Sequence, residues 1–437
     1  MSGDGRLPCV LVILDGLGDR PVPGLGGRTP SEAARTPVLD ELARRGASGW
    51  HVPLGWGRAP SSELAHWALF GYGGEPFPGR AVLEGLGAGI DVPVGVAVLH
   101  AALRTSEPEG DVVRVTGRAG PADADDAGRL LDAVRALGRR HGVQLDNLGR
   151  AGEALLRFPD CDDGDVSDSD PFFEHLHPWL RPVATSPRGE PLARALAPFL
   201  LEAREVLRAS PVNAARAARG APPLDLLTTK WAGARRPLPP FAELAGVEGA
   251  TVTSSGLYRG FAELLRMRRA DVPARDDLAA EMTERVEAGI RLIAGGACFV
   301  HVHTKATDEA GHTKLPHAKR DALEAIDAGL APLLDLAGRA VVAVTGDHAT
   351  PSTGGVMHTG DPTPFTIAGG AVRPDAVAAF GERPARGGDL GVIAAADVLP
   401  LLFSAADRPA FLGHRTGARP TIALADDPEP LRVPPGG

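Results

Sequence analysis

The sequence predicts an α/β protein built on a doubly wound, mostly parallel sheet, into which a smaller α+β domain is inserted. Strand-like runs rich in branched apolar residues at 9–14, 298–303 and 340–344 alternate with helical patterns, as in parallel sheets that are covered on both faces. Between roughly residues 96 and 260 this alternation gives way to short strand-like runs and acidic loops. At 437 residues the chain is also long enough for two or three domains.

The elements of the larger domain follow from local patterns. The first strand, 9–14, ends on Asp15, and Thr36 suits the N-cap of a helix that begins at Pro37. Apolar residues at helical spacing predict a helix over 277–294, which leads into the strand at 298–303. The strand at 340–344 ends just before Asp347 and His348. Because open α/β sheets bind ligands at the carboxyl ends of their strands, these side chains are site candidates.

We expect the core to comprise residues 1–95 and 261–437 and the inserted cap domain to comprise residues 96–260. The insert contains the acidic stretch 160–170 and a helical pattern over 192–208. A Pro-rich segment at 237–240 looks like a linker, and the tail 427–437 looks like a loose terminus.

Composition and charge limit the classes of partner. No apolar run reaches about 18 residues and no signal-peptide pattern precedes the first strand, so we expect a cytoplasmic protein with no membrane partner. The net charge is -9 and the arginines are scattered, whereas a duplex binder needs a clustered basic surface, so we expect no nucleic-acid partner. A monomer and a homo-oligomer both remain open.

Lysine is rare in this chain. Of 46 basic residues only four are lysines, namely Lys230, Lys305, Lys314 and Lys319. A lysine retained in such an arginine-rich chain suggests a need for a compact ammonium group rather than a planar guanidinium.

Three carboxylates and three imidazoles form a candidate metal-binding set that follows the predicted strands. Mixed oxygen and nitrogen ligands favour manganese or zinc, and two metals about 4 Å apart could share them. Each residue alone has an ordinary explanation, since an Asp after a strand is common in turns. It is the joint position of the six residues that predicts a metal centre. They are Asp15, Asp308, His312, Asp347, His348 and His358.

Ser62, in Pro60-Ser-Ser-Glu-Leu-Ala-His66, is the candidate nucleophile. Its simpler interpretation is the N-cap of a helix that begins behind it. The two roles are compatible, because the N-terminus of a helix directs backbone amides and a positive dipole end at an incoming phosphate, while a metal lowers the pKa of the hydroxyl.

Several longer motifs are distributed along nearly the whole chain. They are Leu14-Asp-Gly-Leu-Gly-Asp-Arg-Pro21, Ala68-Leu-Phe-Gly-Tyr72, Pro78-Gly-Arg80, Glu84-Gly-Leu-Gly-Ala-Gly89, Val166-Ser-Asp-Ser-Asp-Pro171, Ser210-Pro-Val-Asn213, Lys305-Ala-Thr-Asp-Glu-Ala-Gly-His312 and Thr345-Gly-Asp-His-Ala-Thr-Pro351. These motifs resemble those of the archaeal-type cofactor-independent phosphoglycerate mutases of the alkaline phosphatase superfamily. The resemblance implies an alkaline-phosphatase-like core with an inserted cap.

The resemblance also implies a site and a reaction. Phosphate would pass from 3-phosphoglycerate to Ser62 and back to the 2-hydroxyl of the same glycerate, with two divalent metals, manganese foremost and zinc, magnesium or cobalt as alternatives. One metal would be bound by Asp15, Ser62, Asp347 and His348, and the other by Asp308, His312 and His358.

The substrate-binding segments depart from the family pattern. Where the family has Arg-Gly-Ala-Gly, this chain has Lys230-Trp-Ala-Gly233, and a Gly-His-Arg element is Leu148-Gly-Arg150. Lost bidentate arginines would remove charge-assisted hydrogen bonds of about 1.5–3 kcal/mol each. Lys305 is the expected catalytic lysine. Arg80, Asp168 and Asp170 have a simpler alternative as mutual ion pairs or loop caps. The candidate substrate-binding residues are Arg80, Arg118, Arg150, Asp168, Asp170 and Lys230.

This combination leaves three functions open. The first is a phosphoglycerate mutase-like enzyme acting on a small phosphorylated or phosphonylated carboxylic acid. The second is a phosphatase or phosphonate-processing enzyme of specialised metabolism. The third is a catalytically inactive binding homologue, which the intact set of ligand types disfavours.

Overall fold

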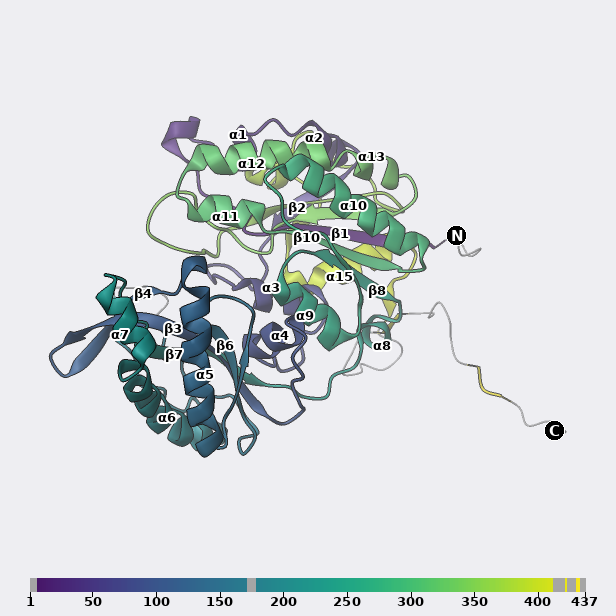
Figure 1. The fold of residues 1–437 in the computed structure, drawn as a ribbon. Helices are drawn as coiled ribbons and strands as arrows, with labels where there is room; N and C mark the ends of the chain where they lie inside the picture. Colours follow the sequence, from purple (N-terminus) through teal and green to yellow (C-terminus); the bar gives the residue numbers. More distant parts are fainter. Residues whose placement is uncertain (1–5, 171–177, 412–420, 423–429, 433–437) are drawn as a thin grey trace. The chain divides into compact units, whose positions relative to one another are not determined.

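The computed structural model describes residues 6–170, 178–411, 421–422 and 430–432. The chain forms two compact units (Figure 1). Unit 1 comprises Met1–Phe77, Pro239–Ser255 and Leu265–Gly437, and unit 2 comprises Pro78–Leu238 and Gly256–Leu264. Unit 2 thus begins at Pro78 rather than at residue 96, and residues 239–255 return to unit 1. The expected linker at 237–240 spans this return, and most of the tail 427–437 lies outside the described residues.

Unit 1 is built on an eight-stranded sheet that is mostly parallel, which confirms the predicted fold class. Only β12 is antiparallel to its two neighbours. In sheet order the strands are β13 (Gly391–Ile393), β2 (Gly46–His51), β12 (Thr363–Ala368), β11 (Val341–Thr345), β1 (Cys9–Leu14), β10 (Phe299–Thr304), β8 (Gly249–Thr253) and β9 (Arg268–Asp271).

Strand β1 lies at the centre of this sheet and is buried on both faces. Because side chains alternate along a strand, Val10, Val12 and Leu14 enter one apolar core while their neighbours face the opposite side. Helices cover both faces of the sheet (Figure 1). On the first face lie α2 (Pro37–Arg44), α10 (Leu278–Ala294), α12 (Pro316–Gly329) and α13 (Pro332–Leu336), and on the second α3 (Ser62–Leu69) and α15 (Ala395–Ala405).

The starts of two helices show that local sequence patterns predicted the cap in one case and not in the other. Helix α10 begins after Asp277, whose side chain accepts from the Ala280 amide at 3.0 Å. Helix α2 begins at Pro37 as predicted, but the Thr36 side chain makes no cap hydrogen bond. Asp327, far along the chain in α12, accepts from the Val38 and Leu39 amides instead, at 3.1 and 2.8 Å. A tertiary contact has replaced the expected local cap.

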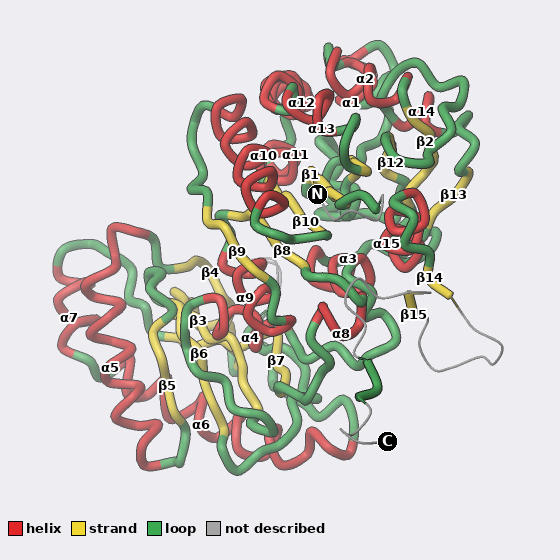
Figure 2. The backbone as a smooth tube through the Cα atoms, turned by 90° about the vertical axis from the view of Figure 1, so that its right-hand side faces the viewer, coloured by secondary structure: helices red, strands yellow, loops and turns green. Residues whose placement is uncertain are grey.

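Unit 2 is an α+β domain with a five-stranded antiparallel sheet. One face of β3 packs under helices α5 and α6 through alternate apolar residues such as Leu99 and Leu103. Figure 2 shows the helices lining this side of the strands. The elements are β3 (Ala97–Glu109), β4 (Val112–Arg118), β5 (Gln144–Asn147), β6 (Glu153–Phe158), β7 (Leu226–Ala234), α4 (Arg80–Gly87), α5 (Ala124–Arg140), α6 (Glu190–Arg208), α7 (Pro211–Ala218) and α9 (Gly256–Leu265).

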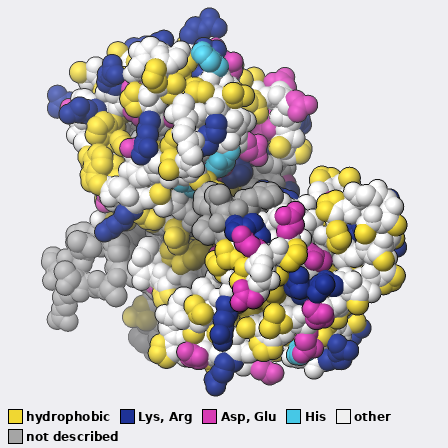
Figure 3. Space-filling model, turned by 90° about the vertical axis from the view of Figure 1, so that its left-hand side faces the viewer, with side chains coloured by type: hydrophobic (Ala, Val, Ile, Leu, Met, Phe, Trp, Pro, Cys, Tyr) yellow, Lys and Arg dark blue, Asp and Glu magenta, His cyan; other side chains and the backbone are white. Residues whose placement is uncertain are grey.

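The face of the molecule shown in Figure 3 is mixed in charge. On this face, Lys and Arg side chains are interspersed with Asp and Glu, unlike the clustered basic surface of duplex-binding proteins. Within the described part of the chain, no helix is both long enough and apolar enough to cross a bilayer.

Glu382 introduces a pH dependence into unit 1. It begins α14 (Glu382–Ala385), is buried, and accepts hydrogen bonds from Thr29 Oγ1 at 2.6 Å, the Asp19 amide at 3.2 Å and the Ser31 hydroxyl. Burial raises the pKa of this carboxyl to about 7. Because the folded pKa lies above the unfolded value, the protonated form contributes stability at low pH that is lost as the pH rises through 7.

We therefore expect Glu382→Gln to remove this loss. Relative to the variant, the wild type should lose about 3 kcal/mol in free energy of unfolding between pH 4.5 and 8, since each pKa unit corresponds to about 1.4 kcal/mol. Urea unfolding across this range measures the difference. The exposed Glu287 in α10 is the control, and its Gln variant should track the wild type. Parallel pH profiles for Glu382→Gln and wild type would contradict the prediction.

Candidate metal centre

The parallel register of three strands brings the candidate ligands to one edge of the sheet. Leu14 at the end of β1 pairs with Thr304 of β10, and Ile13 pairs with Thr345 of β11. The residues that follow these strand ends therefore lie close together. They are Asp15 after β1, Asp308 and His312 on α11 (Ala306–His312) after β10, and Asp347 and His348 after β11, while His358 precedes β12.

The first ligand group is Asp15, Asp347 and His348, all fully buried. Their ligand atoms lie within 4.8 Å of one another. His348 Nε2 is 3.3 Å from Asp15 Oδ1 and 3.6 Å from Asp347 Oδ2. Ser62 Oγ joins this group, 3.0 Å from His348 Nε2 and 3.5 Å from Asp15 Oδ1. The four residues predicted to bind one metal therefore converge.

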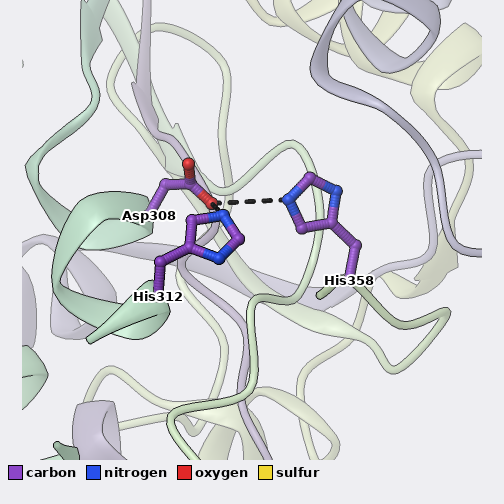
Figure 4. Close-up of side chains that lie close together, drawn as sticks. All are labelled: Asp308, His312 and His358. Atoms are coloured by element: carbon purple, nitrogen blue, oxygen red, sulfur yellow. Dashed lines mark ion pairs between the residues drawn. The ribbon is translucent and has the colours of Figure 1, made fainter. Parts of the chain in front are cut away.

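The second ligand group is Asp308, His312 and His358 (Figure 4). His312 Nε2 and His358 Nε2 lie 3.1 and 3.5 Å from the same oxygen, Asp308 Oδ1. The two histidines come from different elements, α11 and the loop before β12, and their side chains converge on the carboxylate from different directions (Figure 4). The three residues predicted to bind the other metal also converge.

The two groups are directly adjacent. The rings of His348 and His358 stack with centroids 3.9 Å apart. Lys305 Nζ lies 3.0 Å from Asp308 Oδ2 and 3.8 Å from Asp15 Oδ2, so one ammonium serves both groups. Thr350 Oγ1 donates to Asp308 Oδ1 at 2.7 Å and lies 3.2 Å from His348 Nδ1. The two ligand groups therefore form one continuous cluster of side chains.

The chemistry of this donor set fits bound cations. Three buried carboxylates lie close together here, those of Asp15, Asp308 and Asp347. The ammonium of Lys305 lies near Asp15 and Asp308. Burying unpaired charge is costly. Among the residues that the structure describes, the buried atoms Asp347 Oδ2 and His358 Nε2 have no hydrogen-bond partner. Divalent cations would satisfy both atoms and balance the charge.

Without a bound cation, burial and neighbouring charges shift the pKa values of Asp347, His348 and Asp308. Burial and the negative charge of Asp15 raise the pKa of Asp347. Burial opposes a charged His348, but the carboxylates of Asp347 and Asp15 raise its pKa to about 9. Burial also opposes a charged Asp308, yet the imidazoles of His312 and His358 beside it and the charge of Lys305 hold its pKa well below the usual range. A cation would remove the repulsion that Asp347 experiences.

Ser62 occupies the first turn of α3. The N-cap is Ser61, so the expectation that Ser62 is itself the cap is wrong, although the helix does begin there. The hydroxyl of Ser62 is consequently not used to cap the helix, and it faces His348 and Asp15. Its position in the first helical turn provides the positive dipole end that favours a phosphate.

Two histidines near the first group were not singled out from the sequence. His303 Nε2 lies 3.0 Å from Asp15 Oδ2, and His66 Nδ1 donates to the Ser62 carbonyl at 2.8 Å and lies 3.5 Å from Asp347 Oδ2. Both are buried. The available signal was spacing: His303 lies next to the end of a strand of the sheet, and His66 lies one helical turn after Ser62.

The candidate substrate-binding residues lie in unit 2, and most are already paired. Arg80 and Arg150 bind the buried Glu84 at 3.2 and 2.9 Å. Asp170 pairs with Lys230 at 3.5 Å and with Arg104, which the sequence did not single out, at 2.6 Å. Asp168 Oδ1 accepts from the Trp231 amide at 2.8 Å, and Arg118 is exposed at the end of β4.

Trp231 is the centre of this cluster in unit 2. Its backbone has φ +59°, an unusual conformation for a bulky residue. Arg80 and Lys230 lie over its ring, 3.9 and 4.3 Å from the centroid, and the His100 ring is 5.0 Å away. Strained residues of this kind cluster at functional sites.

Comparison with known proteins defines the class. The model of the metalloenzyme superfamily matches residues 7–405, so the metal dependence expected from the ligand types is a property of the chain's superfamily. Within that superfamily the chain belongs to the family of 2,3-bisphosphoglycerate-independent phosphoglycerate mutases, which confirms the family resemblance drawn from its motifs.

The similarity extends over almost the whole length of the relatives. The chain is 34% identical to the mutase of Methanoculleus marisnigri, covering 94% of this chain and 98% of the relative, and 33% identical to that of Pyrococcus abyssi, covering 91% and 97%. A solved Pyrococcus horikoshii protein superposes with a TM-score of 0.74 at 28% identity, covering 92% of this chain and 98% of that one. The cofactor-independent phosphoglycerate mutase of Thermoplasma acidophilum gives 0.62 at 30% identity, covering 92% and 100%.

Proposed function

We propose that this enzyme moves a phosphoryl group between two hydroxyls of a small phosphorylated carboxylic acid, converting 3-phosphoglycerate to 2-phosphoglycerate through a phosphoserine at Ser62. The observation that carries the proposal is the position of Ser62 Oγ, in the first turn of α3 and 3.0 Å from His348 Nε2 in a converged ligand set. Family membership supports the same reaction class, because the curated relatives are named as phosphoglycerate mutases.

Each side chain at the sheet edge has a role in this proposal. Asp15, Ser62, Asp347 and His348 would bind one divalent metal, and Asp308, His312 and His358 a second. Manganese suits the mixed ligands best, with zinc, magnesium and cobalt as alternatives. The bound cations would neutralise phosphoryl oxygens and favour the alkoxide of Ser62.

Ser62 and Lys305 would act on the substrate directly. The Ser62 oxygen forms a bond to phosphorus as the bond between phosphorus and the substrate 3-oxygen breaks. After the glycerate reorients, its 2-oxygen forms a bond to phosphorus as the bond between Ser62 and phosphorus breaks, so the serine is regenerated. Burial opposes the ammonium of Lys305, but Asp15, Asp308 and Asp347 raise its pKa above the ordinary value. Lys305 therefore stays cationic, and we assign it a fixed positive charge beside the transferred group rather than a proton.

Substrate binding is the role that the proposal gives to residues of unit 2. We assign this role to the candidate set of Arg80, Arg118, Arg150, Asp168, Asp170 and Lys230. Their internal pairing favours a second candidate function, because Glu84 already contacts Arg80 and Arg150, and Asp170 already contacts Lys230. A phosphatase or a phosphonate-processing enzyme, acting on an acid other than phosphoglycerate, would need fewer free cations there. A cytoplasmic location, and a monomeric or homo-oligomeric state, stay predictions.

The test is direct assay of the purified protein. We expect the manganese-loaded chain to convert 3-phosphoglycerate to 2-phosphoglycerate without added bisphosphoglycerate, as followed by phosphorus NMR. Release of inorganic phosphate in place of 2-phosphoglycerate would favour the hydrolase. Neither product, from a protein shown to contain metal, would contradict the mutase and favour a different phosphorylated or phosphonylated acid.

A further inference from the structure

A single loop joins the two ligand groups. It runs from His348 to His358, so its two ends carry one ligand of each group. The Thr359 amide donates to the Ala349 carbonyl at 3.0 Å, which closes the loop at its base. A loop is the least rigid kind of element on which to mount a metal ligand, and metal geometry tolerates little displacement. Some other contact must therefore fix its course.

Lys319 of α12 holds the first part of this loop. Its ammonium is fully buried and donates to the Thr350 carbonyl at 2.8 Å, the Gly18 carbonyl at 2.9 Å and Asp19 Oδ2 at 3.2 Å. Asp19 in turn accepts from the Ser352 amide at 3.1 and 3.0 Å. The three donors of the ammonium are all used, and they tie the segment after Asp15 to the segment after His348.

Lys314, which follows the C-cap residue of α11, holds the rest of the loop. Its ammonium donates to the Pro351 carbonyl at 2.7 Å and to the Val356 carbonyl at 2.8 Å. Its backbone has φ +59°, a conformation that glycine adopts without steric cost and lysine does not. The side chain therefore occupies a position where the backbone alone would favour glycine.

Both contacts call for lysine in a chain that otherwise prefers arginine. Only four of the 46 basic residues are lysines, and these two each bring main-chain carbonyls together on one small ammonium. A guanidinium is planar and larger, and it distributes its donors along a fork instead of around a point.

We propose that Lys314 and Lys319 are positioning residues of the metal centre: together they fix the loop 349–358 and so deliver His348 and His358 to their ligand groups. The inference rests on the metal centre of the proposed function. It assigns no contact with substrate or metal to either lysine, and it predicts that their loss weakens metal binding without requiring loss of the fold.

Lys314→Gly provides the sharpest test, because it separates two roles of the lysine. A residue that only stabilises the fold would lower the melting temperature when replaced, whereas a positioning residue would lower the affinity for metal. Glycine relieves the positive φ, so the metal-free variant should melt at the same temperature as the wild type or higher. Its affinity for Mn²⁺ should nevertheless fall about tenfold or more at the weaker site, as when supporting contacts of metal ligands are removed. Titration of the metal-free chain with Mn²⁺, with free ion followed by electron paramagnetic resonance, measures the affinity without recourse to activity.

Arg266→Gly is the matched control, because Arg266 is also a basic residue with positive φ, +54°, and it lies outside the loop. It should bind Mn²⁺ as the wild type does. Lys314→Arg should not restore full affinity. Arg320, the partly exposed neighbour of Lys319, pairs with Asp321 rather than with the loop, so Arg320→Met should bind Mn²⁺ as the wild type does. Lys319→Met should weaken Mn²⁺ binding in protein that retains its circular dichroism spectrum.

The outcomes separate this inference from the proposed function. Wild-type affinity in Lys314→Gly would overturn the positioning role and leave the metal centre intact. A wild-type chain that binds no Mn²⁺ would overturn both. Weakened binding in Arg266→Gly as strong as in Lys314→Gly would show a general effect of the substitution and would also overturn the role assigned to the lysine.

Discussion

Ser62→Ala is expected to abolish phosphoryl transfer, with kcat reduced by roughly 10⁴-fold or more, the scale seen when an enzyme loses its nucleophile. The physical reason is that Oγ of Ser62 lies between the first ligand group and the start of α3, 3.0 Å from His348 Nε2. Removing one oxygen leaves the helix and the ligand groups in place. Rapid quenching of wild type with substrate, followed by mass spectrometry, should show a phosphorylated peptide containing Ser62, and the variant should not.

The adjacent serine is a matched control for this experiment. Ser61 is the N-cap of α3 but its side chain makes no cap hydrogen bond, so Ser61→Ala should retain activity within a few-fold of wild type. If Ser62→Ala kept substantial activity, or if phosphate were found on Ser61 instead, the assignment of the nucleophile would be wrong.

The positions of the ligands could be predicted because they depend on strand register. Asp15, Asp347 and His348 follow short, strongly apolar strands, and parallel strands of an α/β sheet place their carboxyl ends together. The family motifs then identified Ser62 and Asp308 among many similar residues. Both the strand ends and the motifs are short local patterns, yet they identify residues that meet in the folded chain.

The contacts that support the ligands could not be predicted, because they form between segments far apart along the chain. Asp327 replaces Thr36 at the start of α2, and Lys319 reaches the carbonyls of Gly18 and Thr350. The rarity of lysine was visible in the sequence, but its purpose was not. Tertiary packing determines which groups become hydrogen-bond partners, and the hydrophobic periodicity of the sequence does not reveal them.

The boundaries of the units differ from the expected ones for a related reason. Helix α4 lies before residue 96, yet it packs against β3 and β7 and so belongs to unit 2. Conversely, β8 lies within the expected insert but pairs in parallel with β10. Composition marks a change of pattern along the chain, whereas a domain is defined by which elements share a core.

Asp347→Asn and Asp308→Asn are each expected to remove one of two bound metals. Both substitutions preserve shape and delete the negative charge that a hard cation requires. Manganese content, measured by mass spectrometry after loading and desalting, should fall from about two per chain to about one in each variant. Loss of several kcal/mol of electrostatic stabilisation should lower kcat by about 10³-fold. Chelation of the wild type should abolish activity, and added Mn²⁺ should restore it.

The same two variants should affect the stability of the metal-free protein in opposite directions. Burial and Asp15 raise the pKa of Asp347 above its unfolded value, so its ionised form costs stability at pH 8 and Asp347→Asn should raise the melting temperature. Asp308 has the reverse shift, because the neighbouring imidazoles of His312 and His358 and the charge of Lys305 stabilise its carboxylate against the cost of burial. Its contribution is present above the unfolded pKa, so Asp308→Asn should lower the melting temperature at pH 8. Shifts of the same sign in both metal-free variants would contradict this account, even if both had lost a metal.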